Sequence, residues 1–289
     1  MLRPFFHQQE GFRVTWFTHQ TKVAYPSEIL PLKSSDILLI PELFVWQFAA
    51  KEPGVPKVVF NQNAYQTFRG QSVAHNVSPY DKPDCIASIV VSEDSRRYLE
   101  FAFAGHPVFR IRHSIDPSLF RFQAEKRRQI ALMPRKNAYD VAQVANLLNC
   151  RGKLNGFTLV PIEGKSETEV ADILRESMIF LSFSTQEGFG LPPLEAMACG
   201  CVVVGYDGFG GREYFQRGHA VVIPQGDVIG FAAAVEKTIV GLDANPDKWR
   251  GLTRSASEFV LSTYTPRQEE QEIMEAWRQI LALPQLGER

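Results

Sequence analysis

The chain has 289 residues, 45% hydrophobic and 22% charged, and its 31 basic and 32 acidic side chains give a formal charge of −1. This length allows about two domains, and the composition excludes a disordered, collagen-like or coiled-coil protein. No block of five like charges occurs in the sequence, so nucleic acid is not an expected partner.

The N-terminal sequence and the cysteines predict the compartment. The first residues, MLRPFFHQQEGF, lack an apolar core behind the arginine, and no stretch approaches 18 uninterrupted apolar residues. The four cysteines are too few and too scattered for a disulfide framework in a chain of this length. We therefore expect a cytoplasmic protein with reduced thiols.

Short runs rich in Val and Ile alternate with helical patterns through most of the chain. This alternation predicts parallel sheets with helices on both faces. The expected strands are Val14–Thr18, Ile37–Ile40, Val58–Asn61, Ile86–Ser92, Val108–Ile111, Ile130–Met133, Phe157–Pro161, Ile179–Ser182, Val202–Tyr206 and Ala220–Ile223. The expected helices are Glu93–Phe103, Asn137–Leu148, Leu194–Cys199, Val228–Leu242, Lys248–Thr263 and Pro266–Leu283. In the first helix, Leu99, Phe101 and Phe103 are expected in the core.

The segment Arg112–Arg128 marks the best domain boundary. One strand ends before it, Pro117 and several charges interrupt it, and a new strand begins at Ile130. We therefore predict two doubly wound α/β units, at residues 1–112 and 113–265, followed by a helical segment at residues 266–289. The first unit is the shorter one.

The segment Ser182–Glu213, SFSTQEGFGLPPLEAMACGCVVVGYDGFGGRE, carries the most specific motif. It predicts a strand, a glycine-rich loop that holds Glu187, a helix that begins after two prolines and holds Glu195, and a second strand. In an open α/β sheet such a helix start lies beyond the carboxyl ends of the strands, where it offers N–H groups and a positive dipole end to phosphate. Each glutamate alone could be an ordinary loop or helix-start carboxylate, but the combination favours a ligand site.

The run EGFGLPPLEAMACG resembles the E-x7-E motif of retaining GT-B glycosyltransferases, especially glycosyltransferase family 4. Gly210, Gly211 and Glu213 resemble the family's following GGxxE turn, with one residue instead of two before the glutamate. IVVSEDSRRYL, IRHSIDPSLF and IALMPR are similar to further family segments along the chain. The resemblance implies the GT-B fold, with two Rossmann-like domains, the N-terminal one reduced. It also implies that the last helix crosses back onto the N-terminal domain.

The resemblance assigns a role to each residue of the motif. Glu187 would be the catalytic carboxylate that faces the transferred sugar and stabilises positive charge at the anomeric carbon. Arg135, with Lys136, would hold the diphosphate of a nucleotide-diphosphate sugar, which suits the forked guanidinium. Glu195 would bind the ribose diol. The remaining donor-binding residues would be Gly188, Phe189, Gly190 and Leu191.

The implied activity is retaining transfer of a sugar, of hexosyltransferase type, to a saccharide, a lipid-linked acceptor or another hydroxyl. No cofactor and no metal are expected, because nothing in the sequence resembles a DxD-type metal loop. Alternatives are a non-catalytic nucleotide-sugar-binding or partner subunit and a GT-B sugar-nucleotide epimerase. A lipid-linked acceptor would bring the chain to a membrane, yet no strongly basic amphipathic helix supports this. The oligomeric state is not indicated.

Candidate acceptor residues come from polar segments that follow strands in the first unit. FNQNAYQTF supplies Gln62, Asn63 and Tyr65, and His75 lies further along. The asparagines could equally cap an ordinary turn, and a lone histidine is more often a packing or surface residue. We predict an acceptor cleft on this side.

Overall fold

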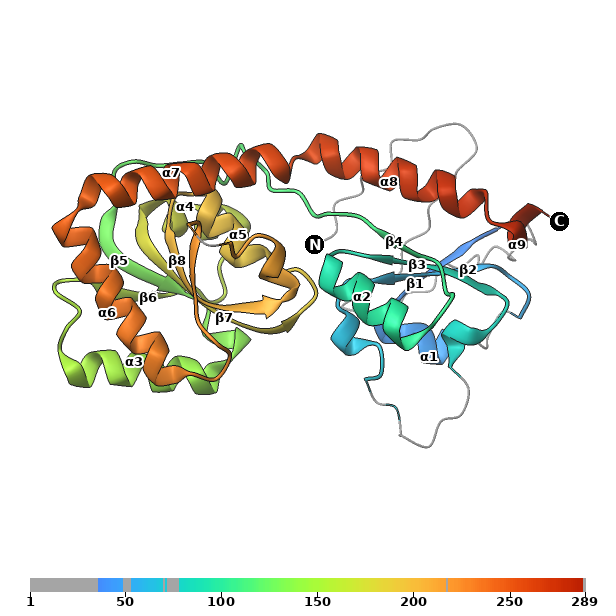
Figure 1. Cartoon of the computed structure of the whole chain (residues 1–289), viewed down its shortest axis with the longest axis horizontal. Coiled ribbons are helices and arrows are strands. Elements are labelled where there is room, and N and C mark those ends of the chain that lie inside the picture. Colours follow the sequence, from blue (N-terminus) through green and yellow to red (C-terminus); the bar gives the residue numbers. More distant parts are fainter. Residues whose placement is uncertain (1–35, 49–52, 70, 72–77, 217, 288–289) are drawn as a thin grey trace.

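The computed structural model describes residues 36–48, 53–69, 71, 78–216 and 218–287. Within these residues the chain forms two α/β units, each built on a parallel sheet, which lie side by side (Figure 1). The expected strand Val14–Thr18 and the candidate His75 lie outside the described residues.

The first unit is a four-stranded parallel sheet with the strand order β1-β2-β3-β4. Its elements are β1 (Leu38–Pro41), α1 (Val45–Phe48), β2 (Lys57–Asn61), β3 (Cys85–Val90), α2 (Glu93–Ala102) and β4 (Val108–Arg110). Every residue of β3 is buried, as expected for a central strand covered on both faces.

Helix α2 buries some, but not all, of the residues that the sequence predicted for the core. Leu99 and Phe103 are 0% and 5% exposed, whereas Phe101 is 93% exposed, so the prediction for Phe101 was wrong. The reason is the helical period, because residues four apart share a face while a residue two positions on lies on the opposite side. Ser92 begins the helix by accepting a hydrogen bond from Ser95 N at 3.1 Å.

The second unit is a five-stranded parallel sheet with the strand order β6-β5-β7-β8-β9. Its strands are β5 (Arg127–Leu132), β6 (Thr158–Pro161), β7 (Ser177–Glu187), β8 (Val202–Phe209) and β9 (Ala220–Val222). Its helices are α3 (Ala138–Arg151), α4 (Glu167–Glu176), α5 (Leu191–Ala198), α6 (Val228–Ala244) and α7 (Pro246–Thr263). This order reverses between β5 and β7, and the carboxyl ends of the strands at such a reversal are where open α/β sheets bind ligands.

Two hydrophobic cores cover the two faces of the second sheet. Phe180 of β7 packs with Leu194 of α5 in one core, and its neighbour Ile179 packs with Phe231 of α6 in the other. Alternating residues of a strand point to opposite faces, so a continuous apolar strand serves both cores. The sheet therefore holds α5 firmly at its carboxyl edge.

Helix α8 (Pro266–Leu281) leaves the second unit and covers the first sheet, and the short helix α9 (Pro284–Gly287) follows it (Figure 1). Thr265 caps its start by accepting a hydrogen bond from Gln268 N. Its apolar residues Ala276 and Ile280 are buried against Val58 and Ile86 of the first sheet. The C-terminal segment therefore ties the two units together.

Candidate active site

A pocket of about 390 Å³ lies at the carboxyl ends of β5 and β7, where the strand order reverses. Residues of both units and of the connection between them line it. They include Gln62, Asn63, His113, Arg135, Lys136, Lys165, Glu167, Glu187, Gly188, Phe189, Gly190, Leu191 and Glu195. Every residue predicted as catalytic or donor-binding therefore lies in one pocket.

Glu187 and Lys136 form an ion pair inside this pocket. Lys136 Nζ lies 2.5 Å from Glu187 Oε1, and both side chains are about one-fifth exposed. Arg135, next to Lys136 in the turn after β5, is exposed at the pocket wall. One cationic side chain, Lys136, thus pairs with a carboxylate from the neighbouring strand, and a second, Arg135, lines the same pocket.

Glu187 is the last residue of β7 and not a loop residue as expected from the sequence. It pairs with Phe209 of β8 after an irregularity in the register that begins at Ser184. The polar end of the strand, STQE, has no apolar pattern to signal it, and only pairing with β8 extends the strand this far. The carboxylate is therefore carried at the carboxyl end of a central strand, which fixes its backbone better than a loop does.

Helix α5 begins at the pocket without a side-chain cap. Gly190 precedes it with φ of +87°, a left-handed conformation that glycine adopts without strain. The buried Tyr214 hydroxyl donates to the Phe189 carbonyl at 2.9 Å and also contacts the Gly190 carbonyl. This fixes the loop, so the positive dipole end of α5 faces the pocket.

Glu195 lies in the first turns of α5 and carries the most perturbed carboxylate of the pocket. Burial raises the pKa of Glu195 to about 7; the nearby Glu167 carboxylate adds to the rise, and Lys136 opposes it. A pocket carboxyl group whose pKa is raised this far is typical of functional sites.

The start of α4 was missed by the sequence reasoning, although it supplies Lys165 and Glu167 to the pocket wall. Its signal was present, because Ser166 and Glu169 form a capping box in which each side chain binds the other's backbone N–H. His113 also lines the pocket, with Nδ1 3.5 Å from Glu269 Oε1 on α8. The histidine lines the pocket because it lies in the connection between the two units, which its residue type alone does not indicate.

The first unit closes the pocket through the turn after β2. Asn63 Nδ2 donates to the Gln186 carbonyl at 2.9 Å, and the buried Glu42 accepts from Gln62 N at 3.2 Å. A Cβ placed on Gly188 would lie 1.7 Å from the Gln62 carbonyl oxygen. The backbones of the two units are thus in direct contact at the pocket.

The candidate acceptor residues divide into two groups. Gln62 and Asn63 line the pocket. Tyr65 is not among the residues that line this pocket; its hydroxyl donates to Asp94 Oδ2 at 2.7 Å and its ring packs on Phe209. Its observed contacts therefore lie between elements near the pocket and not in it.

The described residues contain neither a cluster of metal ligands nor a membrane-spanning helix. Three or more His, Cys, Asp or Glu side chains do not gather there in an arrangement that could hold a metal ion. Of the helices described, none has both the length and the apolar character needed to cross a bilayer.

Part of the second unit matches a known protein family. Residues 159–242, which include β7, α5 and β8, match the family described as glycosyl transferases group 1. An alpha-1,6-glucosyltransferase of Actinobacillus pleuropneumoniae serotype 7 (strain AP76) is 30% identical over 191 residues, covering 63% of this chain and 56% of the relative. The chain thus spans just over half the length of that relative.

Solved structures resemble the whole arrangement of two units. Sucrose-phosphate synthase from Thermosynechococcus elongatus has a TM-score of 0.62 at 16% identity, over 85% of this chain and 74% of that one. Anabaena HepE in complex with UDP and glucose has a TM-score of 0.60 at 14% identity, over 83% of this chain and 78% of that one. The GT-B fold predicted from the sequence is confirmed.

Proposed function

We propose that the chain is a glycosyltransferase that moves a sugar from a nucleotide-diphosphate sugar to a saccharide or other hydroxyl acceptor, with retention and without a metal. The observation that carries the proposal is the pocket itself, where cationic side chains (Arg135, Lys136 and Lys165), carboxylates (Glu167, Glu187 and Glu195) and the start of α5 meet at the reversal of strand order. The match of residues 159–242 to glycosyl transferases group 1 supports the same reaction.

Arg135, Lys136 and the start of α5 would bind the diphosphate. The guanidinium fork can contact two phosphate oxygens at once, and a helix N-terminus carries roughly half a positive charge. These groups would stabilise the negative charge that accumulates on the departing phosphate, which is the main electrostatic need of the reaction. In this proposal they replace the positive charge that a bound metal supplies in other transferases.

Glu195 would accept hydrogen bonds from the ribose hydroxyls of the nucleotide. Its position within the first turns of α5 is adjacent to the proposed diphosphate site. A ribose diol offers two donors, which a carboxylate can accept together. The cost of burying this carboxylate would then be offset in the complex.

Glu187 would face the transferred sugar from the end of β7. Lys136 holds its carboxylate in place, and a fixed negative charge stabilises an oxocarbenium-like anomeric carbon. The bond from the anomeric carbon to the phosphate oxygen breaks, and a bond to the acceptor oxygen forms on the same face. The acceptor proton passes to the departing phosphate oxygen. The configuration is retained because the new bond forms on the face from which the phosphate departs.

The comparisons suggest the first donor to test. The curated relative is an alpha-1,6-glucosyltransferase, and the HepE structure holds UDP and glucose. We therefore propose UDP-glucose as the donor, which fits the expected hexosyltransferase type. The acceptor, a saccharide or a lipid-linked saccharide, would approach past Gln62 and Asn63 in the turn after β2.

The test compares the wild-type chain with Glu187→Gln in a transfer and donor-hydrolysis assay across nucleotide sugars, including UDP-glucose. We expect kcat of the variant to fall at least about 100-fold, because removing one preorganised electrostatic group from an active site typically costs this much. UDP affinity measured by calorimetry should stay within about threefold. Chelator should leave the wild-type rate unchanged.

The matched control is Glu163→Gln, an exposed glutamate of the same unit that lies outside the pocket lining. It should behave as the wild type. Normal turnover by Glu187→Gln would refute the catalytic role. A wild-type chain that binds UDP but transfers and hydrolyses no donor would instead support the non-catalytic nucleotide-sugar-binding subunit.

A further inference from the structure

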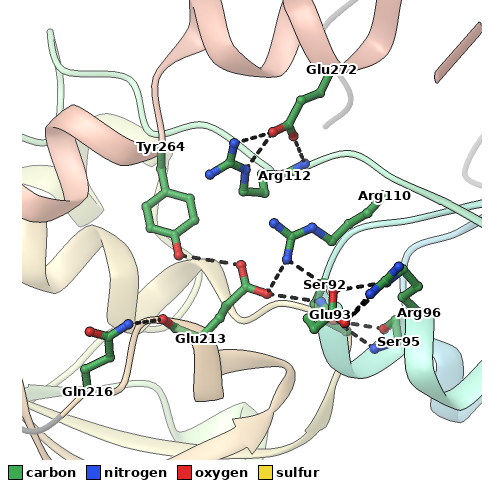
Figure 2. Close-up of polar contacts among 11 residues, drawn as sticks. Ser92, Glu93, Ser95, Arg96, Arg110, Arg112, Glu213, Gln216, Tyr264 and Glu272 are labelled. Atoms are coloured by element: carbon green, nitrogen blue, oxygen red, sulfur yellow. Dashed lines mark hydrogen bonds and ion pairs between the residues drawn. The ribbon is translucent and has the colours of Figure 1, made fainter. Parts of the chain in front are cut away.

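Glu213 lies where the two units and the connection to α8 meet, outside the pocket lining (Figure 2). It ends the short 3-10 turn Gly210–Glu213 that follows β8. Its side chain is 16% exposed, so the carboxylate is largely removed from water and depends on the groups around it. The proposed reaction does not use it.

The carboxylate of Glu213 contacts three separate parts of the chain. Its Oε2 accepts from Glu93 N at 3.1 Å and from Arg110 Nη1 at 3.4 Å, both in the first unit. Its Oε1 accepts from the Tyr264 hydroxyl at 3.5 Å, at the end of α7. Figure 2 shows the carboxylate between these groups.

The contact with Glu93 is a helix cap supplied by the other unit. Glu93 is the first residue of α2, and the first N–H groups of a helix have no partner within it. The N-cap residue Ser92 satisfies Ser95 N, which leaves Glu93 N to Glu213. An anionic group at this end also interacts favourably with the helix dipole.

The same short turn is packed against the backbone that carries the proposed catalytic carboxylate. A Cβ on Gly210 would lie 2.3 Å from the Gly188 carbonyl oxygen and 2.5 Å from that of Glu187. The carbonyl of Gly188 in turn accepts from Ser95 Oγ of α2 at 3.5 Å. A shift of α2 away from Glu213 would therefore disturb the contacts around Glu187.

We propose that Glu213 is a positioning residue, whose carboxylate holds the first turn of α2 against the second unit and so sets the spacing of the two units across the donor pocket. Only the expected effect on kcat rests on the proposed function; the contact between Glu213 and α2 does not. Since catalysis depends on geometry more steeply than nucleotide binding does, loss of Glu213 should lower kcat and leave UDP binding nearly unchanged.

Three variants test the geometry of the contact. Glu213→Ala removes it, Glu213→Asp keeps the charge but withdraws the carboxylate by one methylene, and Glu213→Gln keeps an oxygen at the same reach. We expect kcat to fall at least about tenfold in the Ala and Asp variants and to stay within about threefold in the Gln variant. UDP affinity should remain within about threefold in all three.

Glu236→Ala is the matched control. Glu236 is 12% exposed and binds Arg151 at 2.5 Å, but both residues belong to the second unit. Loss of this pair should change neither kcat nor hydrogen exchange at Glu93 N. It separates the loss of a Glu–Arg pair from the loss of a contact between units.

Amide hydrogen exchange supplies a readout that needs no turnover. Exchange at Glu93 N should accelerate at least about tenfold in the Ala and Asp variants, because its hydrogen bond to Glu213 is lost. Arg96 N, which bonds to the Ser92 carbonyl within α2, should exchange as in the wild type. An inactive wild type would overturn the proposed function, while the exchange would still decide the role of Glu213.

The proposal is overturned if Glu213→Asp keeps the wild-type kcat and the wild-type protection of Glu93 N. It is also overturned if Glu213→Gln loses as much activity as Glu213→Asp, because an oxygen kept at the original reach would then not be enough to hold α2. If Glu213→Ala does not fold, the Asp and Gln variants decide the matter between them.

Discussion

Gly188→Ala adds a single methyl group at the place where the two units touch. The added Cβ would lie 1.7 Å from the Gln62 carbonyl oxygen, 2.7 Å from its carbonyl carbon and 2.8 Å from Asn63 Cα. All three atoms belong to the backbone, so no side chain can rotate away to relieve the overlap. Either the two units separate or the start of the glycine loop moves.

The size of the movement follows from these distances. The shortest one must double to reach an ordinary van der Waals contact of 3.4 Å. A misplacement of about 1 Å in a catalytic site can cost about 100-fold in rate, so we expect kcat to fall at least about 100-fold. Forcing a methyl group into a packed contact costs about 1–3 kcal/mol, which sets the expected loss of unfolding free energy.

The assay measures kcat with UDP-glucose and the unfolding free energy in urea. Gly251→Ala is the control, because Gly251 lies within α7 and has no atom near the position of the added Cβ. Alanine favours a helix over glycine by about 0.5–1 kcal/mol, so the control should be as active as the wild type and no less stable. A Gly188→Ala variant with wild-type kcat and stability would show that this contact is not present during turnover.

Two further predictions concern pH. Burial raises the pKa of Glu195 from 4.5 to about 7. Ionisation of Glu195 therefore lowers the unfolding free energy by about 3 kcal/mol; this loss is absent below pH 4.5 and complete above pH 7. Glu195→Gln should therefore stabilise the chain at pH 8 but not at pH 4 in urea unfolding, and an equal effect at both would contradict this. His106 contacts Ser88 Oγ at 2.9 Å, and burial lowers its pKa from 6.5 to about 4. The unfolding free energy should therefore fall by about 3 kcal/mol as pH falls from 6.5 to 4. His106→Gln should flatten that loss; an unchanged slope would exclude His106 as its source.

Where the structure describes them, the sequence predicted the strands of both sheets within a few residues, except that β7 continues to Glu187 instead of ending at Ser182. Runs such as IVVS and VVVG are apolar on both sides, and only a central parallel strand buries both. It also predicted the proposed donor residues as a group, because the motif is local. Residues that are separated by only one loop and one helix start keep the same relative positions, however the two units pack against each other.

Prediction from the sequence was weaker where pairing between strands or units decides the structure. Glu187 was expected in a loop, and only the pairing of its strand with β8 shows that it ends β7. Likewise, the sequence did not predict that the Tyr65 hydroxyl binds Asp94. Its partner comes from a different element, which a reading of one segment at a time does not provide.

The amino-acid sequence by itself determined the two-unit α/β architecture and the glycine-flanked carboxylates at a helix start, because periodicity and turn chemistry act over a few residues. Only the tertiary structure decided that Lys136 pairs with Glu187, that Gly188 touches Gln62, and that Glu213 caps a helix of the other unit. These contacts join distant parts of the chain. They depend on how two packed sheets meet, and no local pattern specifies that.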